Sequence, residues 1–236
     1  ESPLSEDLMQ SIALENNLSE TAFININESP IPIRWFTPTL EVDLCGHATM
    51  ASAKILFEHF PDIAGSEISF SSKSGILKVS KNAEDICLNF PADDPELQEM
   101  DALFAEALGK SPIEILRGTD DFLAVFETEQ QIQTMNPDFT KLAKINSRGV
   151  VISAPGNDVD FVSRCFFPQT GVDEDPVTGS AHTMLIPYWA KQLDKIEFKA
   201  HQLSARGGAL DCKLINNRVL ISGKSVIYFE GMISII

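Results

Sequence analysis

Two stretches of the chain carry apolar residues at intervals of three and four, a spacing typical of a helix that buries one face. The first stretch follows Gly46 and the second follows Gly179. A shorter apolar stripe over residues 101–108 precedes Gly109, which suits the position after a helix end, so a third helix is predicted there. Pro187 lies inside the second helix and should bend or interrupt it.

Between the helices, short apolar or alternating runs predict β-strands. One strand in each half carries an Arg-x-Phe-x-Pro block. The other expected strands of the first half lie at 21–26, 68–70, 76–79 and 86–90. Those of the second half lie at 150–153, 210–214, 219–222 and, last, 227–236. Strands that alternate with helices in this way indicate an α/β (α+β) fold.

The order of elements occurs twice, and three sequence blocks recur with it. RWFTP at 34–38 resembles RCFFP at 164–168, CGHA at 45–48 resembles TGSA at 178–181, and KSGIL at 73–77 resembles RGGAL at 206–210. The last two pairs share an offset of 133 residues. A repeat of this kind indicates a duplicated domain. The sequence therefore predicts two pseudo-symmetric domains, each a mostly antiparallel sheet wrapped around a central helix.

The domain boundary is expected after the helix at 101–108, which gives domains at 1–108 and 109–236. No long linker separates them, so they should pack directly on each other. The last strand belongs to the second domain or returns to the first. Because residue 1 is Glu rather than Met, we expect that a strand of the first domain is missing from the printed sequence.

Charge and composition narrow the range of partners. The chain has 34 acidic and 18 basic residues, a formal net charge of -16, which repels nucleic acid and acidic membrane surfaces. No apolar run approaches the roughly 20 residues of a membrane span, and the start does not resemble a secretion signal. The four cysteines are widely spaced without a Cys-x-x-Cys pair, which favours free thiols and a cytoplasmic location.

The two repeated glycines are expected at helix N-termini, where unpaired N–H groups and about half a positive charge attract anions. Two such termini that face each other across a cleft between the domains would hold a small carboxylate, and small-molecule sites are common at domain interfaces. The alternative is that Gly46 and Gly179 only allow two core helices to pack closely.

Cys45 and Thr178 occupy equivalent positions just before these glycines. This arrangement resembles the superfamily of diaminopimelate epimerase and proline racemase, in which opposed cysteines exchange a proton on the α-carbon of the substrate. A threonine hydroxyl without assistance is too weak a base to replace a thiolate. The sequence therefore disfavours a symmetric two-thiol racemase, and Cys45 is interpreted as a packed thiol or as an alternative base.

Several motifs together resemble the PhzF-like isomerase family of phenazine biosynthesis. They lie at residues 9–23, 44–49, 174–182 and 206–208 and span nearly the whole chain. The resemblance implies the duplicated diaminopimelate-epimerase-like fold with the active site in the cleft between the domains. It also implies isomerisation by proton transfer, since the best-known member moves a proton on the ring of a dihydro-hydroxyanthranilate. The usual opening strand and Gly-Asn-Pro turn of the family are not in this sequence.

The resemblance also implies roles for individual residues. Glu20 matches the proton carrier and Asp175 its acidic partner, and His47, at the start of the first long helix, is the third catalytic residue. The residues implied in substrate binding are Ser19, Gly46, Gly179 and Ser180.

The residues themselves are compatible with these roles. The second-half segment equivalent to 17–24 is 146–152, which has no acid where Glu20 stands, so one domain alone supplies the carboxylate. A single carboxylate that takes a proton from one carbon and returns it to another needs no cofactor. We expect a partly dry pocket to raise the pKa of Glu20, and the helix dipole to keep His47 neutral. Asp175 would balance a nearby positive charge or only form a turn, and His182 is given no chemical role.

The leading hypothesis is thus a cofactor-free isomerase that moves a proton on a small unsaturated amino- or hydroxy-carboxylate. One alternative is an amino-acid epimerase or dehydratase with Cys45 as base, and another is a protein-binding module without activity. No spacing indicates a metal site, and no phosphate-binding loop is present in the sequence. A homodimer is expected on family grounds.

Overall fold

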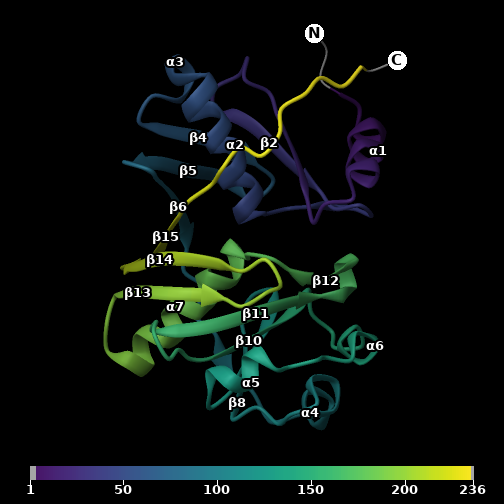
Figure 1. Cartoon of the computed structure of the whole chain (residues 1–236), viewed down its shortest axis with the longest axis vertical. Coiled ribbons are helices and arrows are strands. Elements are labelled where there is room, and N and C mark those ends of the chain that lie inside the picture. Colours follow the sequence, from purple (N-terminus) through teal and green to yellow (C-terminus); the bar gives the residue numbers. More distant parts are fainter. Residues whose placement is uncertain (1–3, 235–236) are drawn as a thin grey trace.

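The computed structural model describes residues 4–234, which form two halves that follow each other along the long axis of the molecule (Figure 1). Each half contains one long helix, α2 (Gly46–His59) in the first and α7 (Gly179–Leu193) in the second. The α/β prediction is confirmed. Among the described residues no helix is long and apolar enough to cross a membrane.

The first half begins with a helix that the periodicity did not predict, α1, whose N-cap Ser5 accepts a hydrogen bond from the Leu8 N–H. The predicted strands at 21–26, 68–70, 76–79 and 86–90 correspond to β1, β4, β5 and β6. Besides α2, the elements up to residue 108 are α1 (Glu6–Asn16), β1 (Thr21–Ile24), β2 (Ile31–Phe36), β3 (Glu41–Val42), α3 (Pro61–Ala64), β4 (Glu67–Ser72), β5 (Gly75–Asn82), β6 (Asp85–Pro91), β7 (Glu96–Leu97) and α4 (Ala102–Leu108).

The second half repeats the central strands and helix of the first. Its predicted strands at 150–153, 210–214 and 219–222 correspond to β10, β14 and β15. Besides α7, its elements are β8 (Glu114–Arg117), β9 (Asp121–Val125), α5 (Glu129–Gln133), α6 (Phe139–Leu142), β10 (Gly149–Pro155), β11 (Phe161–Phe167), a 3-10 turn (Pro168–Thr170), β12 (Val172–Asp175), β13 (Glu197–Gln202), β14 (Gly208–Ile215) and β15 (Arg218–Gly223).

One continuous sheet path joins the two halves, in the order β1-β2-β4-β5-β6-β15-β14-β13-β11-β10-β9-β8-β7. Strand β15 of the second half pairs antiparallel with β6 of the first, with Val219 opposite Phe90. A last strand over 227–236 was expected, but residues 224–234 form none and instead run along the first half (Figure 1). Residues 235 and 236 lie outside the described residues.

The repeat is visible in side-chain contacts as well as in strand order. Arg34 of β2 binds both carboxylate oxygens of Glu41, and Arg164 of β11 binds both oxygens of Glu174 in the same way. Each guanidinium also lies 5.1 Å above the ring of the phenylalanine two residues later. Duplicated ion pairs at equivalent positions indicate that the halves share one ancestral arrangement.

Helix α7 continues through Pro187, so the predicted interruption is wrong. A proline inside a helix leaves the carbonyl four residues earlier without its N–H partner. That carbonyl belongs to Thr183, and it accepts a hydrogen bond from the Asp93 N–H at 3.0 Å. The segment between β6 and β7 thus satisfies the carbonyl that proline leaves free, and the helix reaches Leu193.

The buried apolar residues form a large cluster that spans both halves, a second cluster beneath β10 and β11, and a small third cluster of Met9, Ala13 and Phe36. Helix α4 ends, as predicted, at Gly109 in the left-handed conformation. Its buried Phe104, Ala107 and Leu108 belong to the second cluster, with side chains of the second half. The division into domains at 1–108 and 109–236 stays a prediction. Helix α4, which precedes this boundary, packs on the second half.

Candidate active site

The N-termini of α2 and α7 meet face to face at Gly46 and Gly179. A Cβ added to Gly46 would lie 2.9 Å from the Gly179 Cα, and one added to Gly179 would lie 3.1 Å from the Gly46 Cα. Only glycine fits both positions without a backbone shift. The N-cap residues Cys45 and Thr178 make no side-chain cap hydrogen bond to the first N–H groups of their helices.

A cavity of about 510 Å³ lies between the halves at this meeting point. Its lining brings together nearly all the residues that the sequence singled out. They are Glu20, Cys45, Gly46 and His47 from the first half, and Asp175, Gly179 and Ser180 from the second. Ser19 lies just behind the wall, with its hydroxyl 3.2 Å from His47 Nε2.

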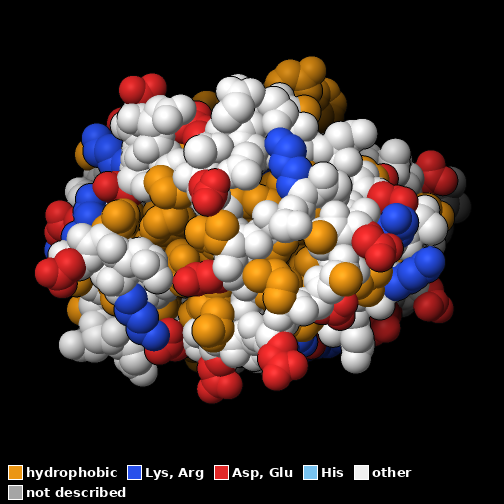
Figure 2. Space-filling view, turned by 90° about the horizontal axis from the view of Figure 1, so that it is seen from below, with side chains coloured by type: hydrophobic (Ala, Val, Ile, Leu, Met, Phe, Trp, Pro, Cys, Tyr) orange, Lys and Arg blue, Asp and Glu red, His pale blue; other side chains and the backbone are white. Residues whose placement is uncertain are grey.

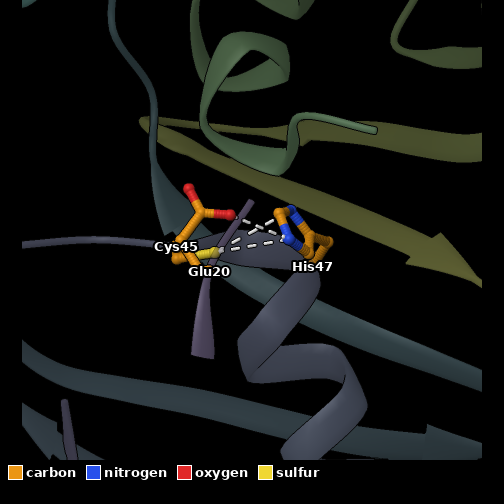
Figure 3. Close-up of side chains that lie close together, drawn as sticks. All are labelled: Glu20, Cys45 and His47. Atoms are coloured by element: carbon orange, nitrogen blue, oxygen red, sulfur yellow. Dashed lines mark hydrogen bonds and ion pairs between the residues drawn. The ribbon is translucent and has the colours of Figure 1, made fainter. Parts of the chain in front are cut away.

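Glu20 precedes β1, and its side chain is 16% exposed. Its Oε2 lies 3.0 Å from His47 Nε2, as Figure 3 shows together with Cys45. This oxygen is buried and, among the described residues, has no well-oriented hydrogen-bond donor. Burial alone raises the pKa of Glu20, but His47, Ser19 and Cys45 together lower it below its usual value. The expectation of a raised pKa is therefore wrong, because the cation beside the carboxylate outweighs the dryness of the pocket.

His47 is the second residue of α2 and lies between carboxylates from the two halves. Its Nδ1 is 3.9 Å from Asp175 Oδ1, opposite the contact of Nε2 with Glu20. Burial lowers the pKa of His47, but Cys45, Glu20 and Asp175 raise it well above its usual value. The expectation of a neutral His47 is wrong, because Cys45 first, and then Glu20 and Asp175, act on the ring at closer range than the helix dipole.

Asp175 ends β12 and reaches the cavity from the second half. Its side chain is 7% exposed, and burial raises its pKa to about 6, with a further contribution from Glu20 and an opposing one from His47. Oδ2 accepts a hydrogen bond from the Thr178 hydroxyl, whereas Oδ1 is buried without a donor among the described residues. Two carboxylates of opposite pKa shift thus flank one imidazole.

Cys45 and Thr178, the opposed pair at the helix starts, do not form two bases. Burial raises the pKa of the Cys45 thiol, although its Sγ lies 3.8 Å from His47 Nδ1. The Thr178 hydroxyl is occupied as a donor to Asp175. A protonated thiol and a donating hydroxyl agree with the prediction that this pair does not act as a symmetric racemase.

The ligand atoms of Glu20, Cys45 and His47 all lie within 4.8 Å of one another, close enough to bind a metal ion together. Spacing along the chain did not indicate this set, because Glu20 comes from a separate element. The same three side chains are already joined by an ion pair and weak contacts to sulfur. That the protein needs no metal therefore stays a prediction.

Two residues of the site were missed in the sequence. Gln202 of β13 fixes the turn after Asp175, since its side chain bonds the Thr178 N–H and hydroxyl and the Asp175 carbonyl. Arg148 lines the cavity beside Ser180. Its signal was a charged residue next to Gly149, in the segment already aligned with Glu20. His182 is buried away from the cavity, and burial lowers its pKa to about 4.

The fold and the site define a class of protein, in which two pseudo-symmetric halves of the epimerase type enclose a polar cavity. A hydroxyproline epimerase from Agrobacterium vitis shares this fold, with a TM-score of 0.59 at 12% identity, over 89% of this chain and 72% of that one.

Closer relatives identify the family. The pattern of the family described as phenazine biosynthesis-like protein (PhzC-PhzF) matches residues 1–231. An uncharacterized isomerase of Pseudomonas aeruginosa is 48% identical over 98% of this chain and 88% of its own length. The crystal structure of a PhzF family protein from Enterococcus faecalis has a TM-score of 0.89 and 45% identity, over 95% of this chain and 86% of that one. The chain belongs to the phenazine biosynthesis-like (PhzF) family.

Proposed function

We propose that the protein is an isomerase that moves a proton between two carbons of a small unsaturated carboxylate bearing an amino or hydroxy group. Glu20 is the proton carrier. The observation that carries this proposal is the position of Glu20 Oε2, which lies buried in the cavity wall, 3.0 Å from His47 Nε2. A buried carboxylate in a cavity wall, held by one imidazole, is placed to exchange a proton with a bound substrate.

The lowered pKa of Glu20 favours a carboxylate that begins the reaction as the base. It removes a proton from one carbon, and the remaining electron pair spreads into the conjugated system of the substrate. The protonated Glu20 then returns the proton to another carbon, so that one bond to hydrogen breaks and one forms. The net result is isomerisation with no oxidant, reductant or cofactor consumed. His47, with its raised pKa, holds the Glu20 anion in place before and after each transfer.

Asp175 and the helix starts orient the substrate in this proposal. Asp175 Oδ1, which is buried without a donor, accepts a hydrogen bond from the amino or hydroxy group. The first N–H groups of α2 and α7 bind the carboxylate. The two ends of the substrate are thereby fixed on either side of the carbon that meets Glu20.

The proposal is tested by incubation in D2O with a panel of unsaturated amino- and hydroxy-carboxylates, followed by mass spectrometry. The wild type is expected to incorporate deuterium into at least one of them, and Glu20→Gln to lose incorporation by roughly 100-fold or more. Glu15→Gln serves as the matched control, because Glu15 is an exposed acid of α1 outside the cavity. Full incorporation by Glu20→Gln would contradict the role of Glu20.

The same panel separates the alternative in which Cys45 is the base. Its raised pKa argues against a thiolate, so Cys45→Ser is expected to keep most of the incorporation. If Cys45→Ser loses incorporation while Glu20→Gln keeps it, the protein is an epimerase or dehydratase of the thiol type. No incorporation by the wild type across the panel would favour a protein-binding module.

Two further features complete the proposal. The cytoplasm is the proposed compartment, supported by four cysteines that are all unpaired. A homodimer is the proposed assembly, supported by apolar side chains that gather on an exposed face of the molecule between charged ones (Figure 2). Light scattering of the purified protein would measure the mass, and a monomer at micromolar concentration would exclude the dimer.

A further inference from the structure

We propose that Arg148 makes the site specific for a substrate with a full negative charge, by binding its carboxylate at the start of α7. This inference rests on the proposed function and goes further, since it assigns the choice between acids and their neutral analogues to one side chain. Arg148 comes from the second half and faces the same cavity as Glu20.

The duplication shows what Arg148 replaces. In the first half Thr21 pairs with Phe36, and in the second half Val150 pairs with Phe166 at the equivalent point of the sheet. The two residues before these strand positions are therefore equivalent, so that Ser19 and Glu20 correspond to Arg148 and Gly149. The first half delivers an acid to the cavity and the second half delivers a cation.

The structure leaves no room for an acidic side chain at position 149. A Cβ at this position would lie 2.1 Å from a ring carbon of Phe167 and 2.6 Å from the Phe166 carbonyl oxygen. Any side chain there would have to displace the neighbouring strand β11. The charged side chain that the second half places in the cavity near this position is therefore that of Arg148.

The guanidinium of Arg148 is held in one orientation by its neighbours. Its Nε donates to Asp121 Oδ1 at 3.0 Å and its Nη2 to the other oxygen of Asp121, a carboxylate whose side chain is 5% exposed. The guanidinium lies 5.4 Å above the ring of Phe167, and Nη2 also reaches Ser180 Oγ at 3.3 Å. Nη1 has no hydrogen-bond partner among the described residues. Because Asp121 fixes one side of the guanidinium, Nη1 can bind a ligand with little loss of side-chain entropy.

The charges around the cavity leave one place for an anion. Acidic residues line much of it, namely Glu20, Glu41, Asp43, Asp120 and Asp175. The lining cations are His47, which is held between Glu20 and Asp175, and Arg148, which is paired with Asp121 but keeps Nη1 without a partner among the described residues. A carboxylate is therefore attracted to Arg148 and the adjacent Ser180 N–H of α7, and an amino group to the acids across the cavity. The arrangement fits an amino-carboxylate in a single orientation.

The test compares a planar acid with its neutral analogue. 2-Aminobenzoate and 2-aminobenzamide have the same ring and amino group and differ in charge, and calorimetry with the full chain gives the affinity for each. The wild type is expected to bind the acid at least about tenfold more tightly than the amide, since a hydrogen bond to a charged group is lost in the amide. Arg148→Gln is expected to abolish this preference, and Arg148→Lys to keep part of it.

Two further variants control for effects other than the loss of a charge in the cavity. Arg148→Gln leaves the buried Asp121 without its partner, so Arg148→Gln with Asp121→Asn replaces the pair by two neutral amides. Arg117→Gln is the matched control, because Arg117 lies 4.5 Å above the Phe122 ring but outside the cavity lining.

A wild type that binds acid and amide equally, or an acid preference that survives in the double variant, would overturn the role of Arg148. An equal loss of affinity for both ligands would also overturn it, since that result marks a purely structural residue. Binding does not require turnover, and Glu20→Gln should keep the acid preference. If no deuterium is incorporated but the wild type still prefers the acid to the amide, the result contradicts the proposed proton transfer and not the role of Arg148.

Discussion

Glu20 and Asp175 are both carboxylates in the wall of one cavity, yet their proton affinities move in opposite directions. The pKa of Glu20 is lowered, whereas burial raises that of Asp175 to about 6. The difference comes from the contacts of the two groups. Glu20 Oε2 is 3.0 Å from the His47 ring, and Asp175 Oδ1 is 3.9 Å from it. Position relative to one imidazole decides which acid is ionised first.

Asp175→Asn is expected to stabilise the protein at neutral pH while it weakens substrate binding. The pKa of Asp175 rises from 3.8 to about 6 on folding, so the folded state binds the proton more tightly than the unfolded state. The ionised form therefore costs stability as pH rises from about 4 through 6, and the cost is complete above that range. Removal of the charge should raise the free energy of unfolding by about 1 to 3 kcal/mol at pH 7.

Urea unfolding at pH 7 and at pH 4 would measure this gain, which should shrink towards zero at the lower pH. Asp173→Asn is the control, since Asp173 is an exposed acid in the same strand β12. An equal gain at both pH values would show that packing rather than charge is responsible.

That the candidate site residues lie close together could be predicted from the sequence, but their protonation could not. The motifs around Glu20, His47 and Asp175 indicated that these residues meet, and they do line one cavity. The direction of each pKa shift depends on separations of 3 to 4 Å between elements that are distant in the chain. Arg148 was missed for a related reason, since no motif marks a residue whose role arises from its counterpart in the other half.

At the scale of elements, the two helix starts depend on each other through Gly46 and Gly179. Gly46→Ala would place a Cβ 2.9 Å from the Gly179 Cα, and a backbone atom cannot move aside as a side chain can. The helices would have to separate, at a cost of about 1 to 3 kcal/mol in the free energy of unfolding. Deuterium incorporation should fall as well, because the N–H groups proposed to bind the carboxylate move apart.

Chemical denaturation of Gly46→Ala would measure the loss, with Gly223→Ala as the control. At Gly223 the nearest atom to an added Cβ is a carbonyl oxygen at 3.6 Å, an ordinary contact. The two variants should therefore differ clearly. Equal stability of Gly46→Ala and the wild type would show that the helix ends have freedom to separate.

Periodicity predicted the two long helices and most of the central strands, because these elements bury one face in a common core. Helix α1 was not predicted, since it buries little more than Met9 and Ala13 and gives a weak apolar stripe. The continuation of α7 through Pro187 could not be predicted from the local sequence either. The Asp93 N–H that satisfies the Thr183 carbonyl comes from another part of the chain.

At the scale of the whole molecule, the net charge of -16 opposes the approach of any anionic substrate. Added salt screens this repulsion, whereas it acts less on the contacts inside the cavity. The association rate of 2-aminobenzoate should therefore increase by about two- to threefold between 10 and 150 mM salt, and that of 2-aminobenzamide should stay constant. Stopped-flow fluorescence would measure both rates. A rate for the acid that falls with salt would show that the field at the cavity mouth is positive.

The contact between Gly46 and Gly179 also bears on how the molecule originated. If the two halves descend from one gene, their ancestor was a symmetric dimer, and the pair of glycines was a single residue that touched its own copy across the two-fold axis. Any substitution there would have acted twice at one point in space. In such a dimer an acid at the position of Glu20 would also have been present twice. Fusion into one chain removed that restriction, so that the position of Glu20 could be occupied by Gly149 in the second half and the site could become asymmetric.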